Sequence, residues 1–458
     1  MNHIETVDLL IENADIVTFD DAGTVIPDGA LAVKGNTIAW IGTTKDARVR
    51  FTPDQVINAR DQIAMPGLVD AHFHTGQQFL RGKLPALRRS GQLCMPPWKN
   101  YYVPFESLLG SEDMYFSGIA AYASLISVGT TCFLESGGVH PDEMGRAASD
   151  IGIRGRLALS TMDVDDTLPQ NLRTTTDQAL ADNEALVQRW RHHPRVNAWL
   201  GLRQIIVTSE ALKIEMNKLS VALDTPIHTH LSEGTYEIDY AVANWGVRPA
   251  EYLDRIGVFN DRLHTAHAIL LSAEEIDLYA QRGVSVCHCP FGNYSVGKPR
   301  VLEMLRRGVP LGMGTDGAAS RGTVDMFQVA QFARHGQQMI EGTPNHRRDA
   351  TSYEAMLGVA VRGGAQVARM PGQIGSLEVG KLADFILVAK SDVDQFPSYD
   401  PMITLAENSV GRDVRTVVID GRVVMQEREF KSIDFDRMRR QVQDQQRALM
   451  TRFDEKTR

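Results

Sequence analysis

The sequence has few cysteines and no long hydrophobic run, and both absences restrict the class of protein. Four cysteines in 458 residues cannot form the disulfide framework of a small secreted domain. Cys287 and Cys289 in "CHCP" could be metal ligands, but small buried apolar residues are the reading that we favour. No stretch approaches the roughly 20 apolar residues of a membrane span, and the N-terminal stretch lacks the pattern of a secretory signal. We therefore expect a protein of the reducing cytoplasm.

Basic residues are also in deficit. The chain has 48 Lys and Arg against 57 Asp and Glu, which gives a formal net charge of −9. This balance argues against nucleic acid or an anionic membrane as the main partner. The hydrophobic content of 43% and the charged content of 23% are ordinary for a globular protein. A small molecule is the partner that remains.

Two hydrophobic patterns divide the chain. Residues 1–64 and 372–430 alternate apolar and polar residues between turn residues, which predicts one β-sandwich domain built from both termini. Residues 65–371 show eight short apolar runs separated by helical patterns, which is typical of a (β/α)8 TIM barrel in the α/β class. Residues 431–458 predict a C-terminal helix. In such a barrel, functional side chains gather at the C-terminal ends of the strands.

Histidines and one aspartate lie at the ends of these apolar runs. His72 and His74 close the first run, "PGLVDAHFHTG", and side chains at i and i+2 of a strand face the same side. The fifth run, "PIHTHLSEG", and the sixth, "RLHTAHAIL", each carry two histidines, and Asp316 ends the eighth, "VPLGMGTDG". Imidazole and carboxylate ligands suit Zn²⁺, with Fe²⁺ or Mn²⁺ as alternatives.

These motifs also occur in the order of a known family. The segments "PGLVDAHFHTGQQFLRG", "HTHLSEG", "TAHAILLS", "HCPFGN", "GTDG" and "GSLEVGKLADFILV" resemble those of the amidohydrolase superfamily, and within it the cytosine-deaminase-like and triazine-hydrolase-like aminohydrolases. By matched position, the resemblance implies one divalent metal ion, Zn²⁺ first, held by His72, His74, His230 and Asp316. It further implies that Glu233 shuttles protons, that His267 polarises the substrate, and that Asp316 orients the attacking water. His228 and His264 are expected to be buried supporting residues, and the role of His288 stays open.

The sequence departs from the family pattern where substrate contacts are expected. The fourth run, "VNAWLGLRQIIV", lacks the lysine that bridges two metal ions in relatives, which favours a single ion. Arg203 and Gln204 stand where many relatives have Pro-His, and they would favour a ligand with a carboxylate or ring carbonyls. Arg203 could instead pair with a neighbouring carboxylate. The remaining candidate substrate contacts are Gln78 (or its neighbour Gln77), Trp98, for which ordinary packing is the alternative, and Asn293.

The resemblance and the residues together predict hydrolytic deamination. Hydroxide on the metal would attack an amine-bearing carbon of a purine, pterin, pyrimidine or s-triazine-like ring, with Glu233 as the proton shuttle. An alkylamine, a halide or a ring amide could replace the amino group, and a barrel that binds without catalysis is the alternative from another class. A purely structural zinc is disfavoured because the ligands come from distant strands. Relatives are often dimers or larger, so we also expect a homo-oligomer.

Overall fold

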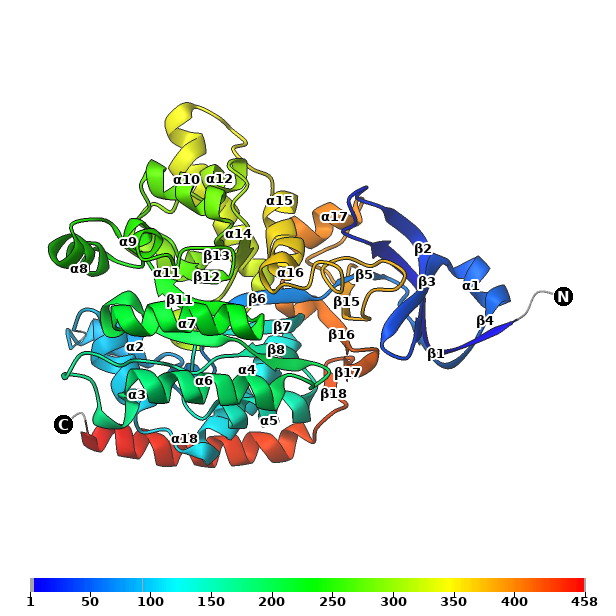
Figure 1. The fold of residues 1–458 in the computed structure, drawn as a ribbon. Coiled ribbons are helices and arrows are strands. Elements are labelled where there is room, and N and C mark those ends of the chain that lie inside the picture. Colours follow the sequence, from blue (N-terminus) through cyan, green and yellow to red (C-terminus); the bar gives the residue numbers. More distant parts are fainter. Residues whose placement is uncertain (1–3, 93, 457–458) are drawn as a thin grey trace.

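A computed structural model describes residues 4–92 and 94–456, and its strands form three sheets. Two of the sheets are parallel and occupy the middle of the molecule, whereas the third is mixed and extends to one side (Figure 1). Within the described residues, no helix has the length and apolar character needed to cross a membrane.

The parallel sheets contain eight strand positions in chain order. The four-stranded sheet comprises β6 (Leu68–Phe73), β7 (Thr130–Glu135), β8 (Arg154–Leu157) and β9 (Val196–Ala198). The five-stranded sheet comprises β10 (Leu200–Gln204), β11 (Ile227–Leu231), β12 (Leu263–His267), β13 (Ser285–His288) and β14 (Leu311–Met313). Only Trp199 separates β9 from β10, so the two together occupy one strand position. This order confirms the predicted succession of parallel strands.

The last and first of these strands lie next to each other, although no ladder joins them within the described residues. Just beyond β14, the backbone N–H of Asp316 donates to the carbonyl of His72 at 3.1 Å. An added Cβ on Gly314 would approach the backbone nitrogen of His72 to 2.8 Å, so only glycine allows this close approach. This contact brings β14 and β6, the last and first parallel strands, together beside His72 and Asp316.

Helices connect the parallel strands, and several of them begin at a residue whose side chain caps the helix. Before α10, the Ser272 hydroxyl accepts from the N–H of Glu275 at 3.1 Å, and the Glu275 carboxylate accepts from the N–H of Ser272 at 3.0 Å. Ser209 caps α7 in the same way through the N–H of Leu212. The longer connecting helices are α4 (Ser111–Ser127), α5 (Pro141–Ile151), α6 (Thr176–Trp190), α7 (Glu210–Leu223), α8 (Thr235–Trp245), α10 (Ala273–Arg282) and α14 (Met326–Gln337).

Shorter helices complete the connections. They are α1 (Thr44–Arg50), α2 (Lys83–Arg89), α3 (Val103–Glu106), α9 (Pro249–Arg255), α11 (Pro290–Val296), α12 (Val301–Arg306), α13 (Gly317–Arg321), α15 (Tyr353–Gly358), α16 (Gly364–Val367) and α17 (Pro401–Ile403). The long helix α18 (Phe435–Lys456) runs along the bottom of the molecule in Figure 1 and buries Leu449 and Phe453. Its Arg452 forms an ion pair with Asp113 of α4 at 2.6 Å.

Strands from both ends of the chain share the mixed sheet. Its order is β18-β17-β16-β15-β5-β1-β2-β3, with β4 pairing with β1, and the N- and C-terminal strands meet where β5 pairs antiparallel with β15. The N-terminal strands are β1 (Glu5–Val17), β2 (Val25–Lys34), β3 (Thr37–Thr43), β4 (Phe51–Asn58) and β5 (Gln62–Pro66). The C-terminal strands are β15 (Phe385–Ala389), β16 (Val414–Ile419), β17 (Arg422–Gln426) and β18 (Glu429–Phe430). The predicted pooling of strands from both termini is therefore confirmed, in a single nine-stranded sheet.

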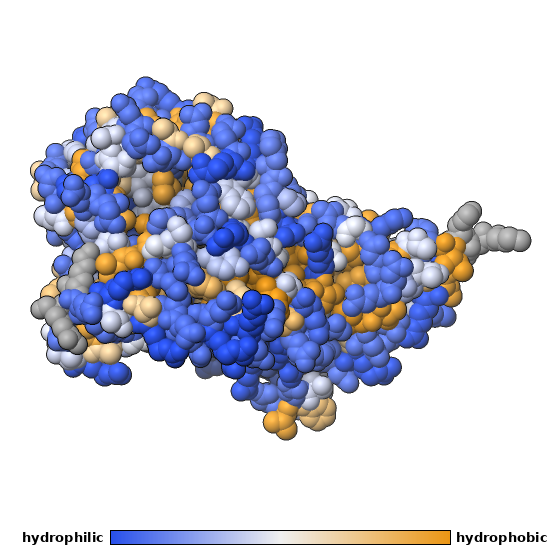
Figure 2. All heavy atoms as spheres, turned by 90° about the horizontal axis from the view of Figure 1, so that it is seen from below, coloured by the Kyte–Doolittle hydropathy of each residue, from blue (hydrophilic) through white to orange (hydrophobic). Residues whose placement is uncertain are grey.

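The mixed sheet has its own small core and projects from the rest. Leu9, Ile11, Leu31, Phe385 and Val418 are among the buried residues of this core. Seen from below, the projecting part narrows away from the parallel strands, and hydrophobic residues gather along it (Figure 2). The exposed apolar side chains there include Val49 of α1 and Val56 of β4, which are 67% and 50% exposed.

Candidate active site

Four histidines and one aspartate meet at the C-terminal ends of the parallel strands. His72 lies in β6, His74 follows it directly, His230 lies in β11, His267 ends β12, and Asp316 follows β14. Ring nitrogens of His72, His74 and His230 lie within 4.8 Å of one another, and so do the ligand atoms of His72, His267 and Asp316. The structure therefore brings together all the ligands that the resemblance implies.

The nearest ligand atoms are close enough to surround one ion. Nε2 of His74 lies 3.2 Å from Nε2 of His230. One carboxylate oxygen, Oδ1 of Asp316, lies 3.3 Å from Nε2 of His72 and 3.5 Å from Nε2 of His74. Nε2 of His72 is buried and has no hydrogen-bond partner among the described residues. A buried nitrogen without a partner is unfavourable unless something outside the chain satisfies it.

Hydrogen bonds behind the rings fix which nitrogen faces the centre. Nδ1 of His230 lies 2.7 Å from the carbonyl of Arg203, and because a carbonyl only accepts, Nδ1 carries the proton and Nε2 presents its lone pair. Nδ1 of His74 lies 2.6 Å from the Ser136 hydroxyl. Burial, reinforced by the neighbouring imidazoles, holds the pKa of both rings well below the usual histidine value. Neutral imidazoles whose Nε2 atoms converge are the donors that a divalent ion such as Zn²⁺ binds.

His267 is held from behind by Asn293. Nδ1 of His267 lies 3.1 Å from Oδ1 of Asn293, and Nδ2 of Asn293 donates to the carbonyl of His267 at 3.1 Å. Burial by itself would lower the pKa of His267, but neighbouring groups, the carboxylate of Glu233 foremost, raise it to about 10. Asn293 is not among the residues that line the pocket, and both ends of its amide are bound to His267, so its predicted substrate contact stays a prediction.

Glu233 faces the same centre and is anchored through one oxygen. Its Oε2 accepts from the hydroxyl of Tyr236 at 2.9 Å and from Nε2 of Gln204 at 3.1 Å. Nε1 of Trp98 in turn donates to the Tyr236 hydroxyl at 3.0 Å. Sequence reasoning missed Tyr236, although its position three residues after Glu233, at the start of α8, was a signal that the two side chains can meet.

Arg203 forms an ion pair with a carboxylate of the protein, Glu106. Such a pair is the alternative to a substrate contact that the sequence leaves open. Nη1 of Arg203 donates to Oε2 of Glu106 at 2.7 Å, and each side chain of this pair is 3% exposed. The other oxygen of Glu106 accepts from Nε2 of Gln77 at 2.8 Å. The charge of Arg203 is therefore largely balanced inside the protein, and the pocket does not present a free guanidinium to a carboxylate substrate.

A small buried pocket opens onto this centre. Its lining residues are His74, Trp98, Tyr102, Arg203, Gln204, His230, Glu233, His267 and Asp316. Gln78 is not among them, and its predicted contact with substrate stays a prediction. The segment Thr75–Leu80 is a short 3₁₀ helix, which turns Gln77 toward His74 and Gln78 toward Ser124 of α4, to which its Nε2 donates at 3.4 Å.

The comparison with known proteins agrees with this constellation. The family model described as "Amidohydrolase family" matches residues 63–424. The chain belongs to the amidohydrolase family. It is accordingly a hydrolase that acts on carbon–nitrogen bonds.

Proteins of known name resemble this amidohydrolase over nearly its whole length. A 5-methylthioadenosine/S-adenosylhomocysteine deaminase of Desulforudis audaxviator is 31% identical, covering 96% of this chain and 99% of its own. That of Acetivibrio thermocellus is 29% identical, with coverage of 96% and 98%. An adenosine deaminase of Xanthomonas campestris, solved with bound zinc, has 29% identity and a TM-score of 0.88 over 98% of this chain and all of its own. A triazine hydrolase from Arthrobacter aurescens shares the fold, with 23% identity and a TM-score of 0.87.

The remaining buried histidines of this amidohydrolase lie next to the candidate metal-binding residues, on the side away from the centre. Nε2 of His228 lies 3.2 Å from Nδ1 of His72. His264 bridges the carbonyl of Ala71 and the hydroxyl of Ser285, at 3.0 and 2.8 Å. Nδ1 of His288 lies 3.0 Å from Nδ2 of Asn293, the residue that holds His267. Cys287 and Cys289 are buried with their sulfur atoms 3.9 Å apart.

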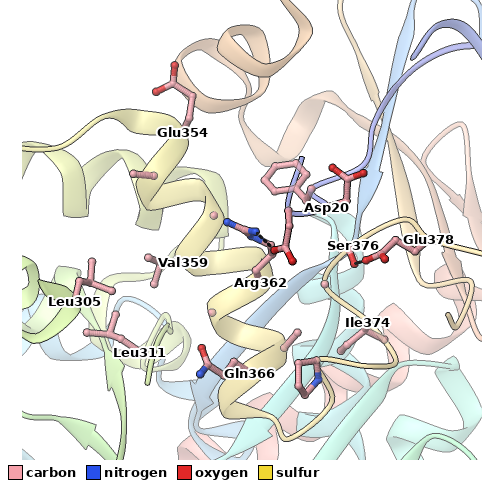
Figure 3. Close-up of a pocket in the computed structure, with 18 of the residues that line it drawn as sticks. Asp20, Leu305, Leu311, Glu354, Val359, Arg362, Gln366, Ile374, Ser376 and Glu378 are labelled. Carbon is pink, nitrogen blue, oxygen red and sulfur yellow. Dashed lines mark hydrogen bonds and ion pairs between the residues drawn. The ribbon is translucent and has the colours of Figure 1, made fainter. Parts of the chain in front are cut away.

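A larger cavity of this amidohydrolase lies elsewhere. It encloses about 590 Å³ between the mixed sheet and the segment Val359–Gly363. Figure 3 shows Val359, Arg362 and Gln366 on one wall, facing the loops that carry Asp20 and Glu378. Nη1 of Arg362 forms an ion pair with Asp21 at 3.1 Å, and the described lining residues include no histidine. The histidine pocket, although smaller, is the one with the chemical groups of a hydrolase.

Proposed function

We propose that this amidohydrolase is a metal-dependent hydrolytic deaminase of a small nitrogen heterocycle, such as a purine, pterin, pyrimidine or s-triazine-like ring. The reaction is C–NH₂ plus water giving C=O plus ammonia. The observation that carries the proposal is the placement of the Glu233 carboxylate in one buried pocket with neutral imidazoles and Asp316. The deaminase names of the relatives support it.

The ligand set fits one divalent ion. His72, His74, His230 and Asp316 would hold it, with Zn²⁺ favoured by the imidazole donors and by the zinc in the adenosine deaminase structure, and Fe²⁺ or Mn²⁺ as alternatives. When bound, such an ion supplies Lewis acidity that lowers the pKa of a coordinated water from about 15.7 toward about 7.

The protein side chains supply the proton transfers. Glu233 accepts a proton from the attacking water and delivers it to the ring nitrogen, then takes the second proton from the hydroxyl group of the tetrahedral adduct and gives it to the departing amine as the C=O bond forms. Because Tyr236 and Gln204 hold Oε2, the free Oε1 is the atom available to move the proton. His267, held through Nδ1 by Asn293, has Nε2 available to stabilise the oxygen as negative charge develops, and Asp316 accepts a hydrogen bond from the water.

The domain and assembly predictions carry over as part of the proposal. The eight strand positions would close into one barrel over residues 65–371, with a β-sandwich domain from residues 1–64 and 372–430 and a C-terminal helix within 431–458. The backbone hydrogen bond between Asp316 and His72 supports closure of the barrel between β14 and β6. A cytoplasmic location and a homo-oligomer stay predictions.

Ammonia release across a panel of amino-heterocycles tests the proposed function. Glu233→Gln should lower turnover at least about a hundredfold, because a general acid–base is lost, while the bound metal stays constant. The matched control, Glu215→Gln on the exposed face of α7, should retain wild-type turnover. Near-wild-type turnover of the Glu233 variant would refute the role of Glu233. Chloride or alkylamine release without ammonia would favour the alternative leaving groups, and no product from any compound would favour a binding protein.

A further inference from the structure

The orientation of the Gln204 amide follows from its neighbours. Its Nε2 lies 3.1 Å from Oε2 of Glu233 and 3.0 Å from the hydroxyl of Tyr236. A carboxylate only accepts, so the amide atom that faces Glu233 must be the NH₂ group. The Tyr236 hydroxyl gives its own proton to Glu233 and therefore accepts from Gln204. The NH₂ group of Gln204 thus faces Glu233 and Tyr236.

The opposite atom of this amide has no partner. Oε1 of Gln204 is buried and makes no hydrogen bond within the described part of the chain, and the residue is 2% exposed. Gln204 nevertheless lines the pocket. Since a buried acceptor without a donor is costly, a donor from a bound molecule is the expected partner.

Two other donors of the pocket wall are already engaged. Nε1 of Trp98 donates to Tyr236, and Nη1 of Arg203 donates to Glu106. The pocket lining therefore includes Gln204, whose Oε1 is an unpartnered acceptor, beside the carboxylate of Glu233. The aromatic rings of Trp98 and Tyr102 also line the pocket and favour a flat ring.

Resting on the proposed function, we propose that the substrate carries a second N–H donor next to the ring nitrogen that Glu233 protonates. Oε1 and Nε2 of Gln204 share one carbon, and Nε2 already touches Glu233. A flat ring that reaches Glu233 with one nitrogen therefore meets Gln204 with the neighbouring position of the same edge. That position is a ring carbon that bears an amino group, so the substrate class is a heterocycle with amino groups on both sides of one ring nitrogen.

This donor requirement separates the chain from relatives named for adenine compounds. An adenine ring has a bare C–H next to the nitrogen beside its amino group, and a C–H is no partner for a buried amide oxygen. The 5-methylthioadenosine/S-adenosylhomocysteine deaminases act, by their names, on such a ring. We expect this amidohydrolase to discriminate against it.

Matched pairs of heterocycles test the requirement. Each pair shares the ring and the leaving amino group and differs only at the neighbouring position, as in 2,6-diaminopurine against adenine and against 2-dimethylamino-6-aminopurine. The N–H member should have a kcat/KM about 10- to 100-fold higher for ammonia release, since its partner leaves Oε1 unpaired. Equal or faster turnover of the members without N–H would overturn the inference and leave the deaminase function standing. If no compound releases ammonia, both the proposed function and this inference are refuted.

Two variants assign the preference to Gln204. Gln204→Leu lowers turnover of both members because Glu233 loses a donor, but the ratio within each pair should fall to within about threefold. The matched control is Gln78→Leu, which makes the same chemical change at a buried glutamine outside the pocket and should keep the wild-type ratio. An unchanged ratio in Gln204→Leu would overturn the assignment. If that variant does not fold, the wild-type pairs still decide the donor requirement.

Discussion

At the scale of single residues, the site depends on side chains that form hydrogen bonds with the candidate metal-binding histidines on the side away from the centre. Ser136 follows β7 directly and places its hydroxyl 2.6 Å from Nδ1 of His74. The Nε2 atom of the same ring points to His230 and Asp316. A hydrogen bond at one imidazole nitrogen orients the other toward the metal and raises its basicity.

Ser136→Ala should therefore weaken metal binding. We expect about a 10- to 100-fold loss of zinc affinity, measured by competition with a chromogenic chelator. Ser90→Ala, at an exposed serine whose hydroxyl bonds to Leu87 and Gln92 of its own turn, is the matched control. Equal affinity in the two variants would show that Ser136 does not orient His74.

At the scale of elements, the start of α8 is built around a buried carboxyl group. Glu237 lies in the first turn of α8, and its Oε2 accepts from the backbone N–H of Glu233 at 2.9 Å. Its other oxygen is buried without a partner among the described residues. Burial raises the pKa of Glu237 from 4.5 to about 8, because a charged carboxylate is disfavoured away from water.

This raised pKa predicts a pH dependence of stability. In the unfolded chain Glu237 ionises near its ordinary pKa, so its contribution to folding is fully present below about pH 4.5 and is lost as the pH rises toward about 8. Glu237→Gln cannot ionise. The free energy of unfolding of the variant, relative to that of the wild type, should therefore increase between pH 5 and 8, by at most about 1.4 kcal/mol per pH unit. Urea unfolding at several pH values measures the difference, and parallel curves would contradict the prediction.

At the scale of the whole molecule, a buried ion pair ties the parallel strands to the mixed sheet. Nε of Arg154, in β8, donates to Oδ2 of Asp384 at 2.6 Å, and its Nη2 donates to Oδ1 at 3.0 Å. Asp384 directly precedes β15. The two side chains are 2% and 1% exposed, and Nη2 also reaches Asp420 at 3.3 Å. Bidentate pairs of this kind fix orientation as well as distance.

Removal of the arginine should destabilise the whole fold. Arg154→Met leaves Asp384 buried without its counter-charge, which is expected to lower the free energy of unfolding by about 3–5 kcal/mol. Urea unfolding measures the change. Lys218→Met, which breaks the exposed pair with Glu215, should leave the stability almost unchanged. A similarly small effect of Arg154→Met would show that the two parts do not depend on this pair.

The sequence by itself determined the order of the elements and the placement of the candidate metal ligands at the ends of strands. The spacing of apolar residues is fixed by covalent geometry, so the parallel strands and the pooling of both termini could be predicted, and membership in the amidohydrolase family is confirmed. His72 and His74 face one centre because a strand alternates its side chains, whatever surrounds them.

Only the tertiary structure decided which partner each pocket side chain takes. Arg203 pairs with Glu106, 97 residues away, and Trp98 donates to Tyr236, 138 residues away. Gln78 bonds to Ser124, 46 residues away. Buried polar groups bond to whichever group the packed chain places beside them, and local spacing carries no information about such distant neighbours.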